Sequence, residues 1–136
     1  MKQEEKTLLL KDLCARLPYG VKCKYSGEIP MLGRVTNNVG ELQQINLSNS
    51  SPFMIHDGNY GFDDVLPFLR PMSSMTEEED KEWQFYKSSI ADSCDELLEQ
   101  KVAELHEWFN VNHLDFRGLI PKGLSLEAPA DMYKTK

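Results

Sequence analysis

The chain has 136 residues, of which 40% are hydrophobic, and a formal net charge of −7, so it has the size and composition of one acidic domain over residues 1–136. Its apolar clusters are much shorter than the roughly 18 residues of a membrane span, and its charged first residues lack the pattern of a signal peptide, so we expect a cytoplasmic protein without membrane contact. Basic residues number 15 against 22 acidic ones and form no broad basic face, which argues against direct binding of nucleic acid.

Residues 1–18 have the periodicity of an amphipathic helix. The apolar positions with helical spacing are Leu9, Leu10, Leu13, Cys14 and Leu17. The charged positions that fall mostly on the other side, and that we expect to face solvent, are Lys6, Lys11, Asp12 and Arg16. Pro18 and Gly20 end the helix, because proline cannot continue the hydrogen-bond ladder and glycine tolerates the turn that follows.

Residues 19–70 have the short apolar runs and polar turns of a β-rich module. The expected strands are 21–25, 29–36, 41–47 and a short fourth strand at 53–56, with turns at 26–27 and 37–40. Pro30 would confine the start of the second strand to a sheet edge, and Gly33 indicates a bulge. A single helical turn is expected within residues 62–69. The pattern predicts a small, curved antiparallel meander or an incomplete barrel.

Two prolines, Pro67 and Pro71, mark the joint between this module and a helical segment over residues 71–112. Neither a regular helix nor an interior strand is expected to run through them, because each lacks a backbone donor. Thr76 and Glu79 have the spacing of a capping box and predict that a helix begins there. A regulatory use of the hydroxyl groups at residues 73–76 is the alternative interpretation of the joint.

The helical segment carries one long apolar stripe, expected on one face of a single helix or of two helices in line. Its members are Trp83, Tyr86, Ile90, Cys94, Leu97, Leu98, Leu105 and Trp108. Weak helix formers at residues 88–93 predict a break, with Asp92 as a candidate cap for a second helix. The pattern ends at residues 110–112.

Acidic residues are concentrated in this helical segment. Between Thr76 and Glu107, eleven acidic residues stand against three lysines, a net charge of −8. Such a face is either solvated, a binding surface for a partner protein, or a mimic of nucleic acid that occupies a basic protein. The candidate partner-binding residues on it are Glu96, Glu99, Glu104 and Glu107.

The tail, residues 113–136, is rich in glycine and proline and also in large apolar residues. We expect it to pack irregularly across the fold as far as Ala128, with residues 131–136 loose. Arg70 and Arg117 are further candidates for partner binding, since each stands among apolar residues and must find a carboxylate or carbonyl partner. Arg117 is expected to hold the tail through Asp115.

Four blocks of the chain are distinctive: residues 11–23 (KDLCARLPYGVKC), 69–79 (LRPMSSMTEEE), 115–124 (DFRGLIPKGL) and 127–129 (EAP). Together they resemble a group of uncharacterised small proteins encoded by gut anaerobic bacteria and their phages or prophages. The resemblance implies a cytosolic protein of a mobile element. It implies no activity, cofactor or catalytic residue.

The sequence contains no compact motif for catalysis, metal binding or a cofactor, and we expect none of these groups. His106 and His113 are seven residues apart, too far along a straight helix to share a metal, although a turn after Asn110 would let them approach each other. His56 is a candidate base beside Asp57. The odd, widely spaced cysteines, Cys14, Cys23 and Cys94, are expected to be reduced and mostly buried in the core.

Two function classes follow from these observations. The first is a non-enzymatic interaction or accessory protein of a phage or mobile element that binds a partner protein through its curved sheet, a strand edge or the acidic helix. The alternative is a small enzyme or a ligand- or metal-binding protein that uses His56, His106 or His113 with nearby carboxylates.

Overall fold

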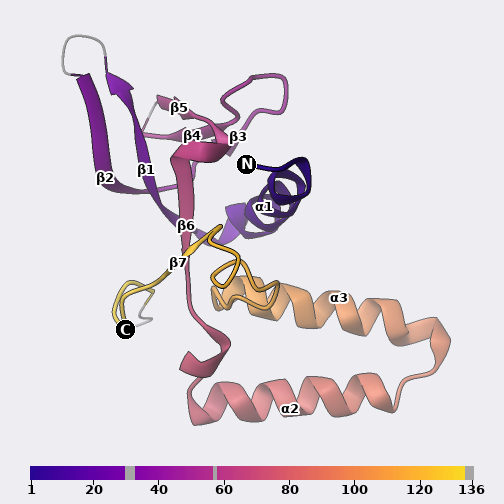
Figure 1. Ribbon diagram of the computed structural model, residues 1–136. Coiled ribbons are helices and arrows are strands. Elements are labelled where there is room, and N and C mark those ends of the chain that lie inside the picture. The colour runs from indigo at the N-terminus through magenta and orange to yellow at the C-terminus, as the bar shows by residue number, and fades with distance from the viewer. Residues whose placement is uncertain (30–32, 57, 134–136) are drawn as a thin grey trace.

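The computed structural model is described for residues 1–29, 33–56 and 58–133, and it has the α+β fold that the sequence predicts (Figure 1). The helices are α1 (Gln3–Arg16), α2 (Glu77–Ala91) and α3 (Asp95–Val111), with short 3₁₀ turns η1 (Leu17–Tyr19), η2 (Phe62–Asp64) and η3 (Met72–Ser74). The strands are β1 (Lys22–Ile29), β2 (Gly33–Glu41), β3 (Gln44–Ile45), β4 (Phe53–Ile55), β5 (Gly58–Tyr60), β6 (Val65–Leu69) and β7 (Leu126–Glu127).

The strands form two small sheets. One has the order β2-β1-β6-β7 and the other β3-β4-β5. Both β1/β2 and β1/β6 are antiparallel, whereas β7 pairs in parallel with β6. The four-stranded sheet has β2 and β7 as open edges, so the described strands do not close into a barrel.

Helix α1 supplies one wall of the main core. Leu9 and Leu13 have no exposed surface and contact side chains from both sheets and from the tail. The other buried members of this core are Val21, Cys23, Leu42, Phe53, Ile55, Val65, Leu69, Leu119 and Leu124. Because the tail contributes Leu119 and Leu124, the expectation that it packs across the fold is confirmed.

The predicted turns at residues 26–27 and 37–40 are wrong, because β1 and β2 run through them. Gly27 and Gly40 serve close packing instead. A Cβ atom at Gly27 would lie 2.8 Å from the Tyr60 ring, and one at Gly40 would lie 2.7 Å from His56 Nε2. The ladder shifts register between Tyr25 and Gly27, so the bulge is there and not at Gly33, which pairs regularly with Ile29. Pro30 lies outside the described residues.

A methyl group at Gly40 should therefore destabilise the fold. Gly40→Ala would press against His56 and the Ile55 side chain, also 2.7 Å from the added carbon, and we expect the free energy of unfolding to fall by about 1–3 kcal/mol. Gly61→Ala is the matched control, since nothing lies closer than 3.8 Å to its added carbon. Urea unfolding measures both, and equal stability of the two variants would contradict the close packing at Gly40.

The predicted helical turn within residues 62–69 is only partly correct. The turn is η2, and the chain then enters β6, an interior strand of alternating burial that contains Pro67. The expectation that no interior strand crosses this proline is therefore wrong. Pro67 lies opposite Cys23 of β1, but β7 pairs only with Phe68 and Leu69, so the proline has one sheet neighbour rather than two.

Helices α2 and α3 fold back on each other as a hairpin rather than lying in line (Figure 1). The capping box is confirmed: Glu79 N donates to Thr76 Oγ1 at 3.1 Å, and Thr76 N donates to Glu79 Oε1 at 2.9 Å. The predicted break is also present, but Asp92 ends α2, and Cys94 is the N-cap of α3. The chain reverses direction at residues 92–94, between the end of α2 and the start of α3.

The tail is more ordered than predicted. Leu126 and Glu127 form β7, which extends the sheet, and Ala128 N donates to Leu69 O at 2.8 Å. The expectation of a loose end from residue 131 is wrong up to Tyr133, whose hydroxyl donates to Phe68 O at 2.8 Å. Residues 134–136 lie outside the described part of the chain.

Candidate functional site

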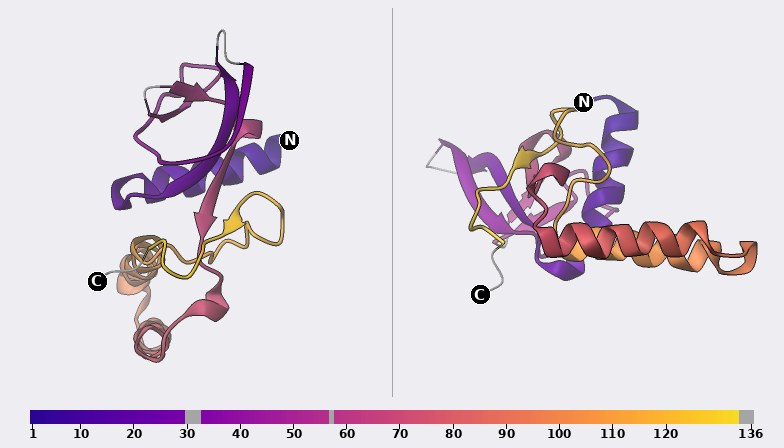
Figure 2. Two further views of the ribbon diagram at one scale, coloured as in Figure 1. Left: turned by 90° about the vertical axis from the view of Figure 1, so that its left-hand side faces the viewer. Right: turned by 90° about the horizontal axis from the view of Figure 1, so that it is seen from below.

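The α2–α3 hairpin, residues 77–111, projects from the body of the molecule (Figure 2) and is called the acidic arm below. It contains all eleven acidic residues and three lysines of the helical segment. From Gln84 to Glu107, none of the described side chains, which exclude that of Asp95, is buried. In the outer part of the arm the two helices therefore cover each other only in part, and none of the described side chains there reaches full burial.

The four predicted partner-binding glutamates all lie on α3 and are exposed. Helical spacing places Glu96, Glu99 and Glu107 toward the outer face, away from α2. Glu107 is near the base of the arm and accepts a hydrogen bond of 2.8 Å from the Tyr19 hydroxyl. Glu104 instead borders the seam between the helices. The structure thus places these carboxylates on two sides of one helix.

The apolar stripe of the arm is not the buried stripe that the sequence predicts. Of its members, Leu97 is 46% exposed and Leu98 is 37% exposed, and Cys94 is also exposed. Phe85, which falls outside the stripe, is 70% exposed. Two helices can cover each other only along one line, so the flanks of the stripe stay open where no third element reaches them.

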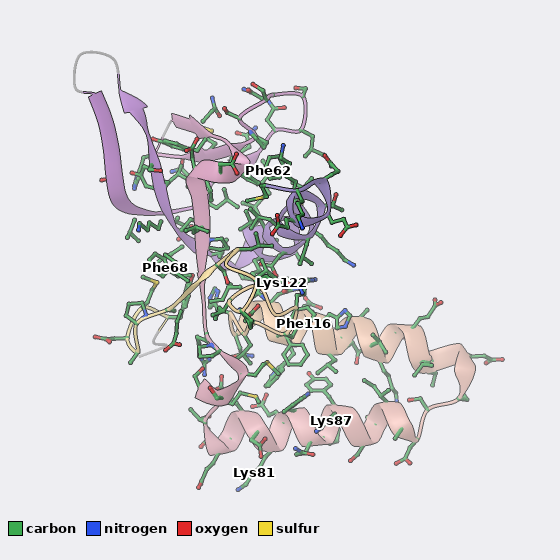
Figure 3. The ribbon with its side chains drawn as sticks, viewed as in Figure 1. Phe62, Phe68, Lys81, Lys87, Phe116 and Lys122 are labelled. Carbon is green, nitrogen blue, oxygen red and sulfur yellow. The ribbon has the colours of Figure 1, made fainter. Side chains whose placement is uncertain are left out.

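Only the base of the arm has a core of its own. Trp108, Phe109 and Leu114 are buried there, and Trp108 Nε1 donates to Glu82 Oε2 at 2.7 Å. Phe109 stacks on Phe116 with ring centroids 4.7 Å apart. Figure 3 shows Phe116 at this base, Lys81 near the start of α2 and Lys87 farther along that helix. The arm is therefore anchored at one end.

Arg70 fixes the start of α2 to the body. Its two terminal nitrogens donate to Glu79 at 2.7 and 2.8 Å, and they also reach the carbonyl groups of Ser74 and Asn112. The hydrogen bonds from Arg70 lower the pKa of Glu79, and the same contact raises the pKa of Arg70. The guanidinium of Arg70 thus makes its hydrogen bonds within the fold, and Glu79 neutralises its charge. A partner would contact the residues around Arg70 rather than its guanidinium.

A buried charge cluster joins α1 to the tail. Asp12 and Arg16 have no exposed surface, so the prediction that they face solvent is wrong. Asp12 accepts hydrogen bonds from Arg16 Nε at 2.9 Å and from an Arg117 terminal nitrogen at 2.7 Å, and Arg16 donates to Leu114 O at 2.6 Å. Burial lowers the pKa of Arg16, and the Asp12 carboxylate opposes that change. Asp12 is therefore the anion shared by two guanidinium groups.

The predicted pairing of Arg117 with Asp115 is wrong. Arg117 turns to Asp12 and lies over the Phe116 ring, 4.3 Å from its centroid. Asp115 instead accepts the backbone amides of Leu119 and Ile120 at 2.8 and 2.9 Å. A carboxylate that caps backbone donors is already satisfied, so Arg117 takes the buried carboxylate of α1.

His113 and Tyr133 hold the end of the tail against the body. Their rings stack with centroids 3.6 Å apart, and the Tyr133 hydroxyl accepts from Lys22 N at 2.8 Å. Burial, followed by the charges of Arg16, Arg70 and Lys22, lowers the pKa of His113 to about 4. Burial also raises the pKa of Tyr133. His113 is therefore neutral in the folded protein at neutral pH.

This neutral histidine should make the fold sensitive to acid. Its folded pKa is about 4 against an ordinary value of 6.5, so the unfolded chain binds the proton more readily. We expect this contribution to stability to be complete above pH 6.5 and to be lost as the pH falls toward 4. His113→Asn, which tolerates the positive φ of 59° at this position, should flatten the stability profile between those values.

Chemical denaturation at a series of pH values measures how steeply the free energy of unfolding depends on pH. His106→Gln is the comparison variant: partial burial lowers the pKa of His106 in the same direction, but His106 is exposed on α3 whereas His113 is buried, so His106→Gln should change the slope less than His113→Asn. If His113→Asn left the pH dependence of the free energy of unfolding unchanged, His113 would not be the source of the acid sensitivity.

The histidines of the alternative hypothesis lie in different surroundings. His56 is exposed, has a φ of 50° and lies beside Tyr25, with ring centroids 6.1 Å apart; Asp57 is outside the described residues. His106 lies on Phe116, with centroids 4.9 Å apart, whereas His113 lies on Tyr133. Within residues 1–29, 33–56 and 58–133, no group of three His, Cys, Asp or Glu side chains is arranged to hold a metal ion.

The cysteines differ from one another. Cys23 is buried in the main core, and burial raises its pKa to about 12. Cys14 and Cys94 are exposed, so the expectation that they are core thiols is wrong for both. On α1, Asp12 and Arg16 take inward positions beside Leu13, and Cys14 consequently turns outward.

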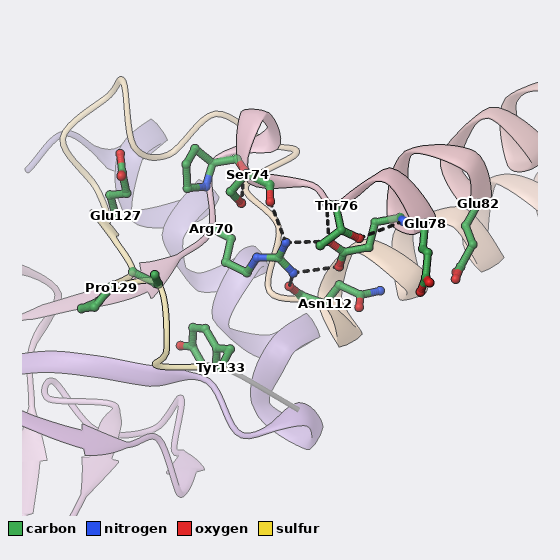
Figure 4. Close-up of a pocket in the computed structure, with 13 residues that line it drawn as sticks. Arg70, Ser74, Thr76, Glu78, Glu82, Asn112, Glu127, Pro129 and Tyr133 are labelled. Atoms are coloured by element: carbon green, nitrogen blue, oxygen red, sulfur yellow. Dashed lines mark hydrogen bonds and ion pairs between the residues drawn. The ribbon is translucent and has the colours of Figure 1, made fainter. Parts of the chain in front are cut away.

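A pocket of about 650 Å³ lies where the acidic arm meets the tail (Figure 4). Figure 4 shows Glu78 and Glu82 of α2 on one side of Arg70, and Glu127 and Pro129 of the tail on the other. The carboxylates of Glu78 and Glu127 make no hydrogen bond or ion pair with any described residue. With Arg70 neutralised by Glu79, the pocket presents a net negative lining.

Comparison with protein-family models, with curated proteins and with solved structures gave no match to this chain. None of the described helices has the length and apolarity needed to cross a membrane.

Proposed function

We propose that this chain is a non-enzymatic interaction protein that binds a partner protein through its acidic arm. The observation that carries the proposal is the unburied outer arm: no described side chain between Gln84 and Glu107 is buried. Helices of this length are marginal in water by themselves and depend on packing of their apolar faces. A partner that covers the stripe would supply the packing that the body does not reach.

The body supports this use of the arm. The base of the arm is held by its own aromatic core, by Arg70 and by the hydrogen bond from Tyr19 to Glu107. These contacts fix the arm at one end and leave its length accessible. A rigid support with an accessible recognition element lowers the entropy lost on binding.

The proposal includes a cellular setting. The protein acts in the cytoplasm as an accessory protein of a phage or other mobile element, the setting implied by the resemblance of its four sequence blocks. Its partner is a protein, and its acidic surface makes direct contact with nucleic acid or an anionic membrane unfavourable.

Capture from a lysate of the source cells tests the proposal with matched variants of the full chain. Leu97→Asp places a charge on the arm at a side chain that is 46% exposed, so the fold should be unaffected. Leu47→Asp makes the same change at a leucine that is 69% exposed in the body. We expect a stoichiometric partner that Leu47→Asp still captures, and we expect Leu97→Asp to capture at least about tenfold less of it.

Two outcomes would overturn the proposal. One is the absence of any stoichiometric partner at either low or high salt. The other is equal capture by both variants, which would move the binding surface away from the arm.

A further inference from the structure

One flank of the acidic arm is bordered by both helices and carries side chains that are exposed or only half-buried. On α3, the side chains of Leu97, Lys101, Glu104 and Trp108 follow spacings of four, three and four, so they line one side of the helix. Leu97 and Glu104 are exposed, Lys101 is half-buried, and Trp108 closes the row at the base. This row runs the length of the arm.

Helix α2 borders the same flank. Glu82 and Tyr86 are four residues apart, and both contact Trp108. Glu82 accepts a hydrogen bond of 2.7 Å from the indole N–H of Trp108, and the ring centroids of Tyr86 and Trp108 are 5.8 Å apart. Ile90, one turn farther along, is only half-buried. The two rows therefore border a flank on which Leu97, Tyr86 and Ile90 form an apolar seam that is only partly covered.

The open flank continues into the pocket at the base of the arm. Glu82 lines both, and the pocket beyond it contains the carboxylates of Glu78 and Glu127, which have no hydrogen-bond or ion-pair partner among the described residues. Pro129 and Ala130 form an apolar part of its wall. This combination suits a long cationic side chain, whose carbon stem lies on apolar atoms while its charged end meets carboxylates.

Charge decides among the possible occupants of the flank. A second copy would bring two arms of net charge −8 together, and an anionic membrane surface would also be repelled. A helix with an apolar stripe fits the seam, because rows spaced three and four residues apart accept the ridges of another helix. Basic residues beside that stripe would complement the arm and the pocket.

We infer that the open flank of the acidic arm binds a basic amphipathic α-helix of a partner protein, with a lysine or arginine of that helix in the pocket between Glu78 and Glu127. The inference rests on the proposed function and names the chemistry of the partner. The apolar seam supplies the affinity, and the carboxylates select a basic partner and increase its association rate.

Designed peptides test this inference on the full chain. The probe is a fluorescein-labelled amphipathic helix of about 21 residues with leucine at the inward heptad positions and lysine beside them. One comparison peptide has glutamate in place of every lysine, and another has the same composition in scrambled order. Fluorescence anisotropy at about 50 mM and about 300 mM salt measures binding.

We expect the basic amphipathic peptide to bind, and the acidic and scrambled peptides to bind at least about tenfold more weakly. Leu97→Asp should weaken binding at least about tenfold, whereas Leu47→Asp should change it less than about twofold. Glu78→Lys should weaken binding several-fold at low salt and less at high salt, because salt screens the charge pair. Glu104→Lys should act in the same direction, while Glu4→Lys on α1 should have little effect.

Four results would overturn the inference. Equal binding of the scrambled peptide would show attraction by charge alone, and binding unaffected by Leu97→Asp would place the peptide elsewhere. A stable dimer of the protein alone that Leu97→Asp dissociates, measured by analytical ultracentrifugation, would assign the flank to a second copy. If lysate capture depends on Leu97 but the basic peptide does not bind, the proposed function stands and this inference fails.

Discussion

Replacement of Asp12 by alanine is expected to lower the free energy of unfolding by about 3–5 kcal/mol, the range found when one partner of a buried ion pair is removed. Asp12 has no exposed surface and is the anion for Arg16 and Arg117. Without it, the guanidinium of Arg16 stays buried with only the Leu114 carbonyl as a hydrogen-bond acceptor. The cost is therefore that of a buried charge left without its counterion.

Urea unfolding followed by tryptophan fluorescence measures this effect, since Trp83 and Trp108 report on the arm and its base. Lys11→Ala, at the neighbouring exposed position, is the control and should change stability by no more than about 0.5 kcal/mol. A loss of less than about 1 kcal/mol in Asp12→Ala would mean that the cluster contributes little. Asp12→Leu combined with Arg16→Met should be more stable than Asp12→Ala, because the combination removes the unpaired charge of Arg16.

The second large effect is expected at the base of the acidic arm. Trp108→Ala removes a side chain that is 9% exposed, its hydrogen bond to Glu82 and its ring contacts with Tyr86 and Phe109, and should cost about 3–5 kcal/mol. Because this core anchors the arm to the body, hydrogen exchange in α2 and α3 should accelerate as well.

Leu97→Ala is the matched control on the same helix. Leu97 is 46% exposed, so its truncation should cost less than about 1 kcal/mol. Urea unfolding and hydrogen exchange measured on both variants test the difference between the base of the arm and its outer part. Comparable losses in the two variants would show that the outer arm is packed, which would also remove the main support for partner binding.

Features with a local cause were predicted well from the sequence. Thr76 and Glu79 form their capping box within a single helical turn, so the residues that decide it are neighbours in the chain. The break near residues 88–93 is likewise a local property of weak helix formers. The net charge of −8 on the arm needs no structure at all.

The strand boundaries were mispredicted because glycine has more than one use. Gly27 and Gly40 carry the chemistry of turns, yet their hydrogen atoms make room for Tyr60 and His56, which are far away in the sequence. Whether a glycine ends a strand or admits a neighbour depends on which side chain approaches it. That information is absent from the local pattern.

The candidate site also has a part that the local sequence predicts and a part that depends on tertiary packing. The exposure of Glu96, Glu99, Glu104 and Glu107 agrees with their place on an acidic helix, but the hairpin that gives them an open flank depends on how α2 and α3 dock. The pocket between Glu78 and Glu127 joins segments about fifty residues apart. No spacing within either segment indicates it.

One signal in the sequence was available and was missed. Asp12 and Arg16 recur with Leu9 and Leu13 at the three- and four-residue spacing of one helix face, so they share the buried face of α1. A charged pair among buried leucines indicates an internal salt bridge as readily as a solvent-facing position.

The sequence by itself determined the α+β class, the acidic charge of the helical segment and the start of α2, because periodicity, charge and capping act over a few residues. Tertiary structure decided the partners of Asp12: Arg117 lies 105 residues away, and the Leu114 carbonyl that receives Arg16 lies 98 residues from it. It also decided the open flank of the arm, since burial is a property of which surfaces meet, and the body of this protein reaches only the arm's base.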